Sequence, residues 1–146
     1  MGRYEKVRRQ YENKRWLITL ILLFVILGGA FIVTNMTKIE LLEDRLSIKG
    51  LYGTTIAFED IAGVSLQNEM PKGLRKDNGI DVIGIRLLGN FSSQELGKLR
   101  IYMKSKQSPY LYIELKSDNY RYIILTQGSG QQTEALYKEL QERLEK

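Results

Sequence analysis

"KLRIYMKSKQSPYLYIELKSDNYRYIIL", residues Lys98 to Leu125, alternates apolar and polar side chains over three successive segments. Because neighbouring side chains on a strand point to opposite faces, this period of two predicts strands at 98–104, 110–116 and 120–125. The triplet Ser117-Asp118-Asn119 predicts a turn between the last two of them. The stretch therefore indicates a β-rich domain.

The alternation continues toward the N-terminus, in segments 39–42, 44–50, 54–61, 61–66 and 80–88. About seven short strands with turn signals between them are typical of a small antiparallel sandwich or barrel. The period changes at the C-terminus, where Leu136, Tyr137, Leu140 and Leu144 share one helical face and Ser129 begins a capping box. We expect this amphipathic helix to cover one open end of the sheet structure.

An uncharged stretch of 21 residues, Trp16 to Met36, precedes the β-rich part. As a helix it would be about 31 Å long, which matches the hydrocarbon core of a bilayer. A cleaved signal peptide is the alternative, but the small residues Gly28, Gly29 and Ala30 lie inside the apolar run rather than after it. A twin-arginine export signal is matched only weakly by "RRQY". We predict an uncleaved transmembrane helix over 16–36.

The flanks of this helix differ in charge. Residues 1–15 hold six basic and two acidic residues, and so account for most of the net charge of +5. By the positive-inside rule this basic tail is cytoplasmic, and residues 37–146 lie on the extracytoplasmic side of the cell membrane. Since the excess charge sits in a short tail, we expect no nucleic-acid partner.

Two residue types that commonly carry chemistry are missing, because the chain has neither cysteine nor histidine. Disulfides, thiolate metal sites, a cysteine nucleophile and the commonest general base are thereby excluded. The adjacent acids Glu43-Asp44 and Glu59-Asp60 point to opposite faces of a strand, so neither pair can act together on one glycosidic bond. We predict that the protein is not an enzyme and uses no catalytic residues, cofactor or metal.

Three glycines, Gly79, Gly84 and Gly89, follow a basic segment and raise the question of a phosphate-binding loop. The nearest match, "GNFSSQELGKLR", lacks the first glycine of that motif and the Ser or Thr after Lys98, and strand-like sequence follows it. We interpret Gly79 and Gly89 as turns, and Gly84 as a bulge or twist within a strand.

Four stretches carry a family resemblance: "DRLSIKGLYGTTIAFEDIAGVSL", "MPKGLRKDNG", "GNFSSQELGKLRIYMKSKQSPYLYIEL" and "YIILTQGSGQQTEALYKEL". Together they resemble the bacterial pleckstrin-homology-like (PH-like) domains often found beside membrane helices, over about Lys38 to Leu144. The resemblance implies a mainly β fold, a seven-stranded sandwich or partly open barrel of two nearly orthogonal antiparallel sheets capped by a C-terminal α-helix. It also implies a non-enzymatic binding or assembly module. Inositol-lipid binding does not carry over, because the turn "KGLYGTT" offers only Lys49 as a cation.

Two surfaces are candidates for binding. The first is a basic face of one strand, formed by Lys98, Arg100, Tyr102, Lys104 and Lys106, which occupy alternate positions. It would suit anionic lipid headgroups or wall polymers, or would simply be a solvated face that discourages edge pairing. The second surface contains Tyr110 and Tyr112, which would share a face with Tyr120 and Tyr122 as a protein-binding patch or as cross-strand packing.

The sequence thus predicts a basic tail (1–15), a single transmembrane helix (16–36) and a PH-like domain (37–146). The predicted function is protein interaction or self-association at the membrane surface. The alternative is binding of anionic lipid or wall polymer through the basic strand face.

Overall fold

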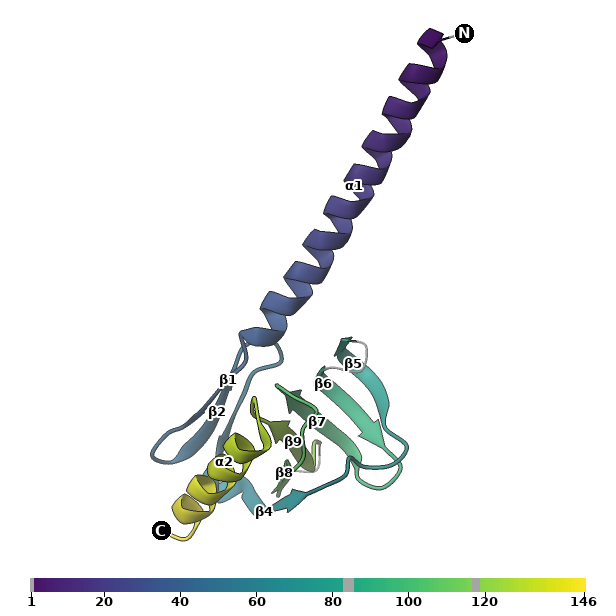
Figure 1. Cartoon of the computed structure of the whole chain (residues 1–146). Coiled ribbons are helices and arrows are strands. Elements are labelled where there is room, and N and C mark those ends of the chain that lie inside the picture. Colours follow the sequence, from purple (N-terminus) through teal and green to yellow (C-terminus); the bar gives the residue numbers. More distant parts are fainter. Residues whose placement is uncertain (1, 83–85, 117–118) are drawn as a thin grey trace. The chain divides into compact units, whose positions relative to one another are not determined.

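The computed structural model describes residues 2–82, 86–116 and 119–146 of the chain (Figure 1). The chain divides into two compact units, Met1–Val33 and Thr34–Lys146. The first unit is formed by most of α1 (Gly2–Asn35). Within the described residues, one segment of this helix, Lys14–Ile32, is long and apolar enough to cross a membrane, with a mean hydropathy of 2.3. A signal sequence near an N-terminus has the same properties.

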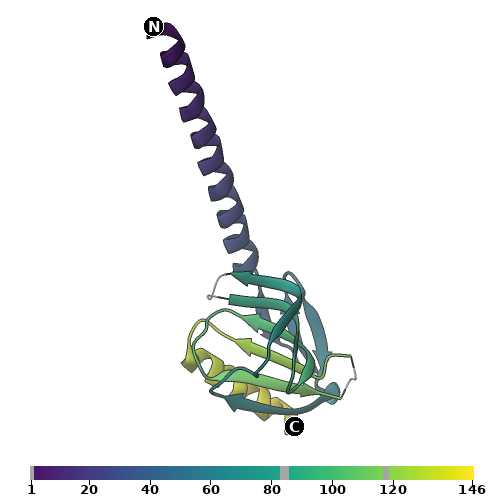
Figure 2. The same ribbon diagram turned by 90° about the vertical axis from the view of Figure 1, so that its right-hand side faces the viewer.

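The described part of the second unit contains nine strands and one long helix. In chain order they are β1 (Lys38–Leu41), β2 (Arg45–Lys49), β3 (Thr54–Ala57), the short 3-10 turn η1 (Phe58–Asp60), β4 (Ile61–Gln67), β5 (Arg75–Val82), β6 (Arg86–Ser93), β7 (Gly97–Met103), β8 (Tyr110–Leu115), β9 (Tyr122–Thr126) and α2 (Gly130–Leu144). They form a three-stranded sheet, β1-β2-β3, and a six-stranded sheet, β4-β8-β9-β7-β6-β5. Figures 1 and 2 show the larger sheet strongly curved, with α2 packed against β4, β8 and β9.

The mainly β fold with two sheets and a C-terminal helix is confirmed, but two details differ from the prediction. The described residues contain nine strands, because the segment 75–79, for which no strand was predicted, belongs to β5. The predicted strand 80–88 is in fact the end of β5 and the start of β6. In addition, β7 and β9 pair in parallel, because β8 lies on the far side of β9 and returns the chain antiparallel to it.

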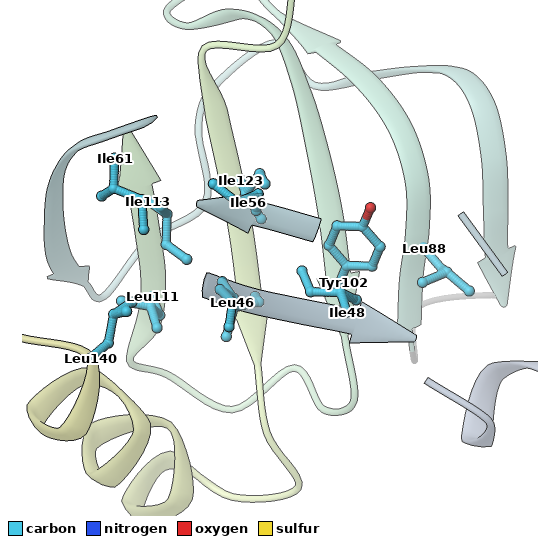
Figure 3. Packing of buried hydrophobic residues seen from close by; sticks show 11 residues of the cluster. Leu46, Ile48, Ile56, Ile61, Leu88, Tyr102, Leu111, Ile113, Ile123 and Leu140 are labelled. Carbon is cyan, nitrogen blue, oxygen red and sulfur yellow. The ribbon is translucent and has the colours of Figure 1, made fainter. Parts of the chain in front are cut away.

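The main hydrophobic core lies between the two sheets and α2 (Figure 3). Leu46 and Ile48 of β2 belong to this core together with Leu111 and Ile113 of β8, and α2 contributes the fully buried Leu140. Burial of one such side chain stabilises the fold by roughly 1.5–3 kcal/mol. The predicted apolar face of the helix is therefore confirmed.

The start of α2 is also as predicted. The Ser129 hydroxyl accepts a hydrogen bond from the backbone N–H of Gln132 at 3.3 Å, which satisfies one of the free donors in the first helical turn. The buried Thr133 hydroxyl accepts from the backbone N–H of Gln127 at 2.9 Å and so ties the helix to the end of β9.

The glycine interpretation was wrong for Gly79 and Gly89. Both lie within strands and pair with each other across β5 and β6, and Gly89 has φ +119°. A Cβ atom on Gly89 would come within 2.7 Å of the Asn78 carbonyl oxygen and 3.2 Å of the Tyr52 ring. The glycines therefore allow Tyr52 to pack closely over this hairpin, where its hydroxyl donates to Asn78 Oδ1 at 3.1 Å. Gly84 lies outside the described residues.

Candidate functional site

The predicted basic face does not exist as one exposed surface, because side chains on both faces of its strand are buried. β7 lies between β6 and β9 in the larger sheet, with one face in the main core and the other in a second core cluster. Leu99, Ile101 and Met103 are buried on the outer face, as predicted. Tyr102 is only 1 % exposed on the inner face, where its hydroxyl donates to the Tyr52 carbonyl oxygen. The prediction that Tyr102 belongs to an exposed face is therefore wrong.

Arg100, also on the inner face of β7, is half-buried. Its guanidinium carbon lies 4.3 Å from the centre of the Tyr120 ring, a distance at which cation and ring attract each other. Its Nε is buried with no hydrogen-bond partner in the described structure. Arg100 lines a pocket of about 510 Å³ together with Thr54, Thr55 and Lys116.

Only one of the three lysines of the predicted face lies on β7. Lys98 is exposed at the beginning of β7, whereas Lys104 and Lys106 follow the end of that strand. Burial, with the nearby charge of Arg86, holds the pKa of Lys104 below its usual value. Lys106 is exposed, and its carbonyl oxygen accepts a hydrogen bond from the Tyr110 hydroxyl at 3.1 Å.

The tyrosines are gathered more closely than the cations. Tyr110 and Tyr112 of β8 and Tyr122 of β9 are half-buried on the outer face of the larger sheet, against a second core cluster that includes Phe91. The predicted shared face is confirmed for these three residues. Tyr120 differs, because it precedes β9 and stacks on Arg100 instead.

Tyr112 and Tyr122 line the floor of a pocket of about 480 Å³, which we name the tyrosine groove. Its other lining residues come from β4 (Gly63, Val64, Ser65, Gln67) and from the loop that follows it (Glu69, Met70, Pro71, Lys72). The remaining three are Glu95 and Leu96, which lie between β6 and β7, and Glu114 of β8. The loop is held over the sheet because the Tyr112 hydroxyl donates to the Glu69 carbonyl oxygen at 2.9 Å. Lys72 reinforces it, since its backbone N–H donates to Glu95 Oε2 at 3.0 Å.

The tyrosine groove has an acidic rim. Glu69, Glu95 and Glu114 carry negative charge, and Lys72 is the cation among the lining residues. Glu114 also accepts from the Arg121 guanidinium at 3.0 Å. Burial, helped by the charge of Glu95, raises the pKa of Tyr112 to about 12, so this phenol is neutral throughout the physiological range. The groove is therefore suited to a cationic or hydrogen-bond-donating group held over aromatic faces.

The sequence reasoning did not identify the three glutamates of the rim. They are far apart in the chain and meet only because the loop after β4 folds back over β8. The available signal was the pair of tyrosine-containing strands, which indicated the floor but not the rim. Among the described residues, no group of three or more acidic side chains is placed to hold a metal ion.

A comparison with protein-family models matched residues 31–144 to a family described as "Bacterial PH domain". The match covers the second unit almost completely. Neither the curated proteins nor the solved structures gave a match.

Proposed function

Because this chain belongs to the bacterial PH domain family, we propose that it is a non-catalytic module that binds a protein partner at the surface of the cell membrane. The observation that carries this proposal is the tyrosine groove. Tyr112 and Tyr122 line this groove and are only half-buried, and tyrosine is favoured at protein interfaces because it combines apolar area with a hydroxyl.

We also propose that α1 anchors the module, with the basic tail in the cytoplasm and the PH-like domain outside. The support is the apolar length of Lys14–Ile32 and the excess of basic residues before it. Single cysteines at Glu5 and Asn119, both exposed, provide the test in a chain that otherwise has none. A membrane-impermeant thiol reagent applied to intact cells is expected to label Asn119→Cys and not Glu5→Cys. The opposite pattern would reverse the orientation, and labelling of both only after lysis would exclude an extracytoplasmic domain.

Protein binding is tested with a photo-crosslinking amino acid in the full-length protein in cells. Placed at Gln67 on the rim of the tyrosine groove, it is expected to give a discrete adduct. Placed at Lys138 on the exposed side of α2, it serves as the matched control and is expected to give none. An adduct near twice the chain mass of 16.9 kDa would indicate self-association, and any other discrete mass a different partner. Failure to form an adduct at Gln67 would contradict the proposal.

A second function, binding of anionic groups, is favoured by one observation. The buried Nε of Arg100 lacks a partner in the described structure, and its pocket is also lined by Thr54, Thr55, Lys116 and one acidic residue, Asp60. A phosphate or carboxylate group would satisfy that donor. In this form the site is a pocket, not the strand face predicted from the sequence.

The anion site is tested with poly(glycerol phosphate) as the probe and the full-length protein in zwitterionic nanodiscs. Binding that falls with salt, and that Arg100→Gln abolishes while Lys106→Gln does not, would support it. Equal binding of the polymer by Arg100→Gln and Lys106→Gln would refute the anion site.

A further inference from the structure

Four strands lie at sheet edges in the described structure, namely β1 and β3 in the smaller sheet and β4 and β5 in the larger one. β1 and β3 have only four residues each, and β5 carries Arg75, Lys76, Asp77 and Asp81. Shortness and charge are two devices by which proteins prevent an edge from pairing with another chain. β4 has neither, because its seven residues, "IAGVSLQ", include no charge and no proline.

The two faces of β4 offer different surroundings to a strand placed beside it. Val64 and Leu66 pair with Ile113 and Leu111 of β8 and are only half-buried against the main core, which also receives Tyr137 of α2. Gly63, Ser65 and Gln67 alternate with them and line the tyrosine groove, to which Val64 also contributes. A strand added at this edge would therefore set one row of side chains beside Val64 and Leu66, and the other row over the groove.

The charge of the tyrosine groove determines which side chains of an added strand would fit over it. The groove carries three glutamates and one lysine, and Arg121 already shows the contacts that a cation makes at its margin. The Arg121 guanidinium lies 3.0 Å from Glu114 and 5.9 Å from the centre of the Tyr122 ring. A second copy of this chain, paired β4 to β4, would bring no charged residue of that strand into the groove.

From these observations we propose that the edge of β4 accepts an extended segment of a protein partner in which apolar and basic residues alternate. The partner backbone adds a strand to β4, its apolar side chains cover Val64 and Leu66, and its lysine or arginine side chains enter the tyrosine groove. This inference rests on the proposed protein-binding function and specifies the chemistry of the partner.

The test uses the full-length protein in zwitterionic nanodiscs and three fluorescently labelled eight-residue peptides. The peptides are alternating Val-Lys, alternating Val-Glu and alternating Ser-Lys, with empty nanodiscs as the lipid control. Anisotropy is expected to show salt-sensitive binding of the Val-Lys peptide, with at least about tenfold weaker binding of the other two. Equal binding of the Val-Lys and Val-Glu peptides would overturn the proposal.

Two variants and one matched control locate the binding. Ser65→Lys places a like charge on the edge and is expected to weaken Val-Lys binding about tenfold, since like charges meet at the interface. Thr55→Lys is the matched control, an exposed hydroxyl residue on the edge strand β3, and is expected to leave binding unchanged. Glu69→Gln removes a rim charge without removing the Tyr112 contact, which uses the Glu69 backbone, and is expected to reduce both affinity and salt dependence.

The outcomes distinguish failure of the β4 site from failure of the proposed protein-binding function. Unchanged binding by both Ser65→Lys and Glu69→Gln would refute the β4 site. If the crosslink at Gln67 persists in cells while the Val-Lys peptide shows no preference, the module binds protein by other chemistry and only this inference fails. A chain that is dimeric until Ser65→Lys makes it monomeric would replace the peptide with a second copy.

Discussion

The clearest test of the structure is the replacement of Tyr102 by alanine. The periodicity of its strand placed this residue on a solvated face, whereas the structure buries it to 1 % exposure in the main core. At an exposed site, removal of the ring would change the free energy of unfolding by no more than about 0.5 kcal/mol. In a core, truncation of an aromatic side chain to alanine costs about 3–5 kcal/mol.

The hydroxyl and the ring of Tyr102 contribute separately to the free energy of unfolding. Tyr102→Phe keeps the ring and removes the hydroxyl with its hydrogen bond to the Tyr52 carbonyl oxygen, so we expect a loss of about 1 kcal/mol. Tyr102→Ala is expected to lose the full amount, a large fraction of the ~5–15 kcal/mol by which a domain of this size is stable. With a urea dependence of about 1–3 kcal/mol per molar, the unfolding midpoint should fall by about 2 M.

Pulse proteolysis of the full-length protein in detergent across a urea series measures these midpoints. Fluorescence is less suitable, because the single tryptophan, Trp16, lies in α1 and does not report on the β domain. Lys98→Ala is the matched control, since it alters an exposed residue of the same strand. Coinciding midpoints for Tyr102→Ala and Lys98→Ala would refute the burial of Tyr102 and the central position of β7.

Three further predictions concern single features of the domain. Tyrosines of the unfolded chain ionise near pH 10, whereas the pKa of Tyr112 in the folded protein is about 12. The free energy of unfolding should therefore decline between pH 10 and 12. When urea midpoints are compared at about pH 9 and about pH 11, this part of the decline should be absent in Tyr112→Phe. Gly89→Ala should cost roughly 1–3 kcal/mol in strain at φ +119°, with a further cost because the added Cβ atom would contact the Asn78 carbonyl oxygen. Gly97→Ala should cost less, because a Cβ atom added there would meet no other atom within 4 Å. Equal thermal midpoints for the two variants would contradict this. Ser129→Ala should cost about 1 kcal/mol by removing the cap of α2, and an unchanged thermal midpoint would mean that the cap contributes nothing.

Local sequence patterns predicted correctly the features that depend on a single helix or strand. The face of α2 that contains Leu140 and its cap at Ser129 were both readable, because helix periodicity and capping depend on residues within a few positions of one another. The outer face of β7, with Leu99 and Ile101, was readable for the same reason. The apolar segment in α1 was equally plain from composition alone.

The tertiary neighbours of each strand could not be predicted from local sequence patterns. Alternation shows that Arg100 and Tyr102 share a face, but what packs over the sheet decides whether that face meets water. Here Tyr102 is buried in one core cluster with Leu46 and Ile48 of the smaller sheet. The same limit hid strand β5, since a polar edge strand such as "RKDNG" resembles a loop in sequence.

The sequence by itself determined the apolar helix, the β-rich domain, the capped C-terminal helix and the absence of cysteine and histidine chemistry. Only the tertiary structure decided that Tyr102 is core, that Gly79 and Gly89 face each other, and that Tyr112 and Tyr122 meet three distant glutamates beside an uncharged edge strand. The physical reason is the distance along the chain between the residues that determine each property. Side-chain direction and capping are local properties of the backbone, whereas burial and the composition of a groove depend on pairings between residues dozens of positions apart.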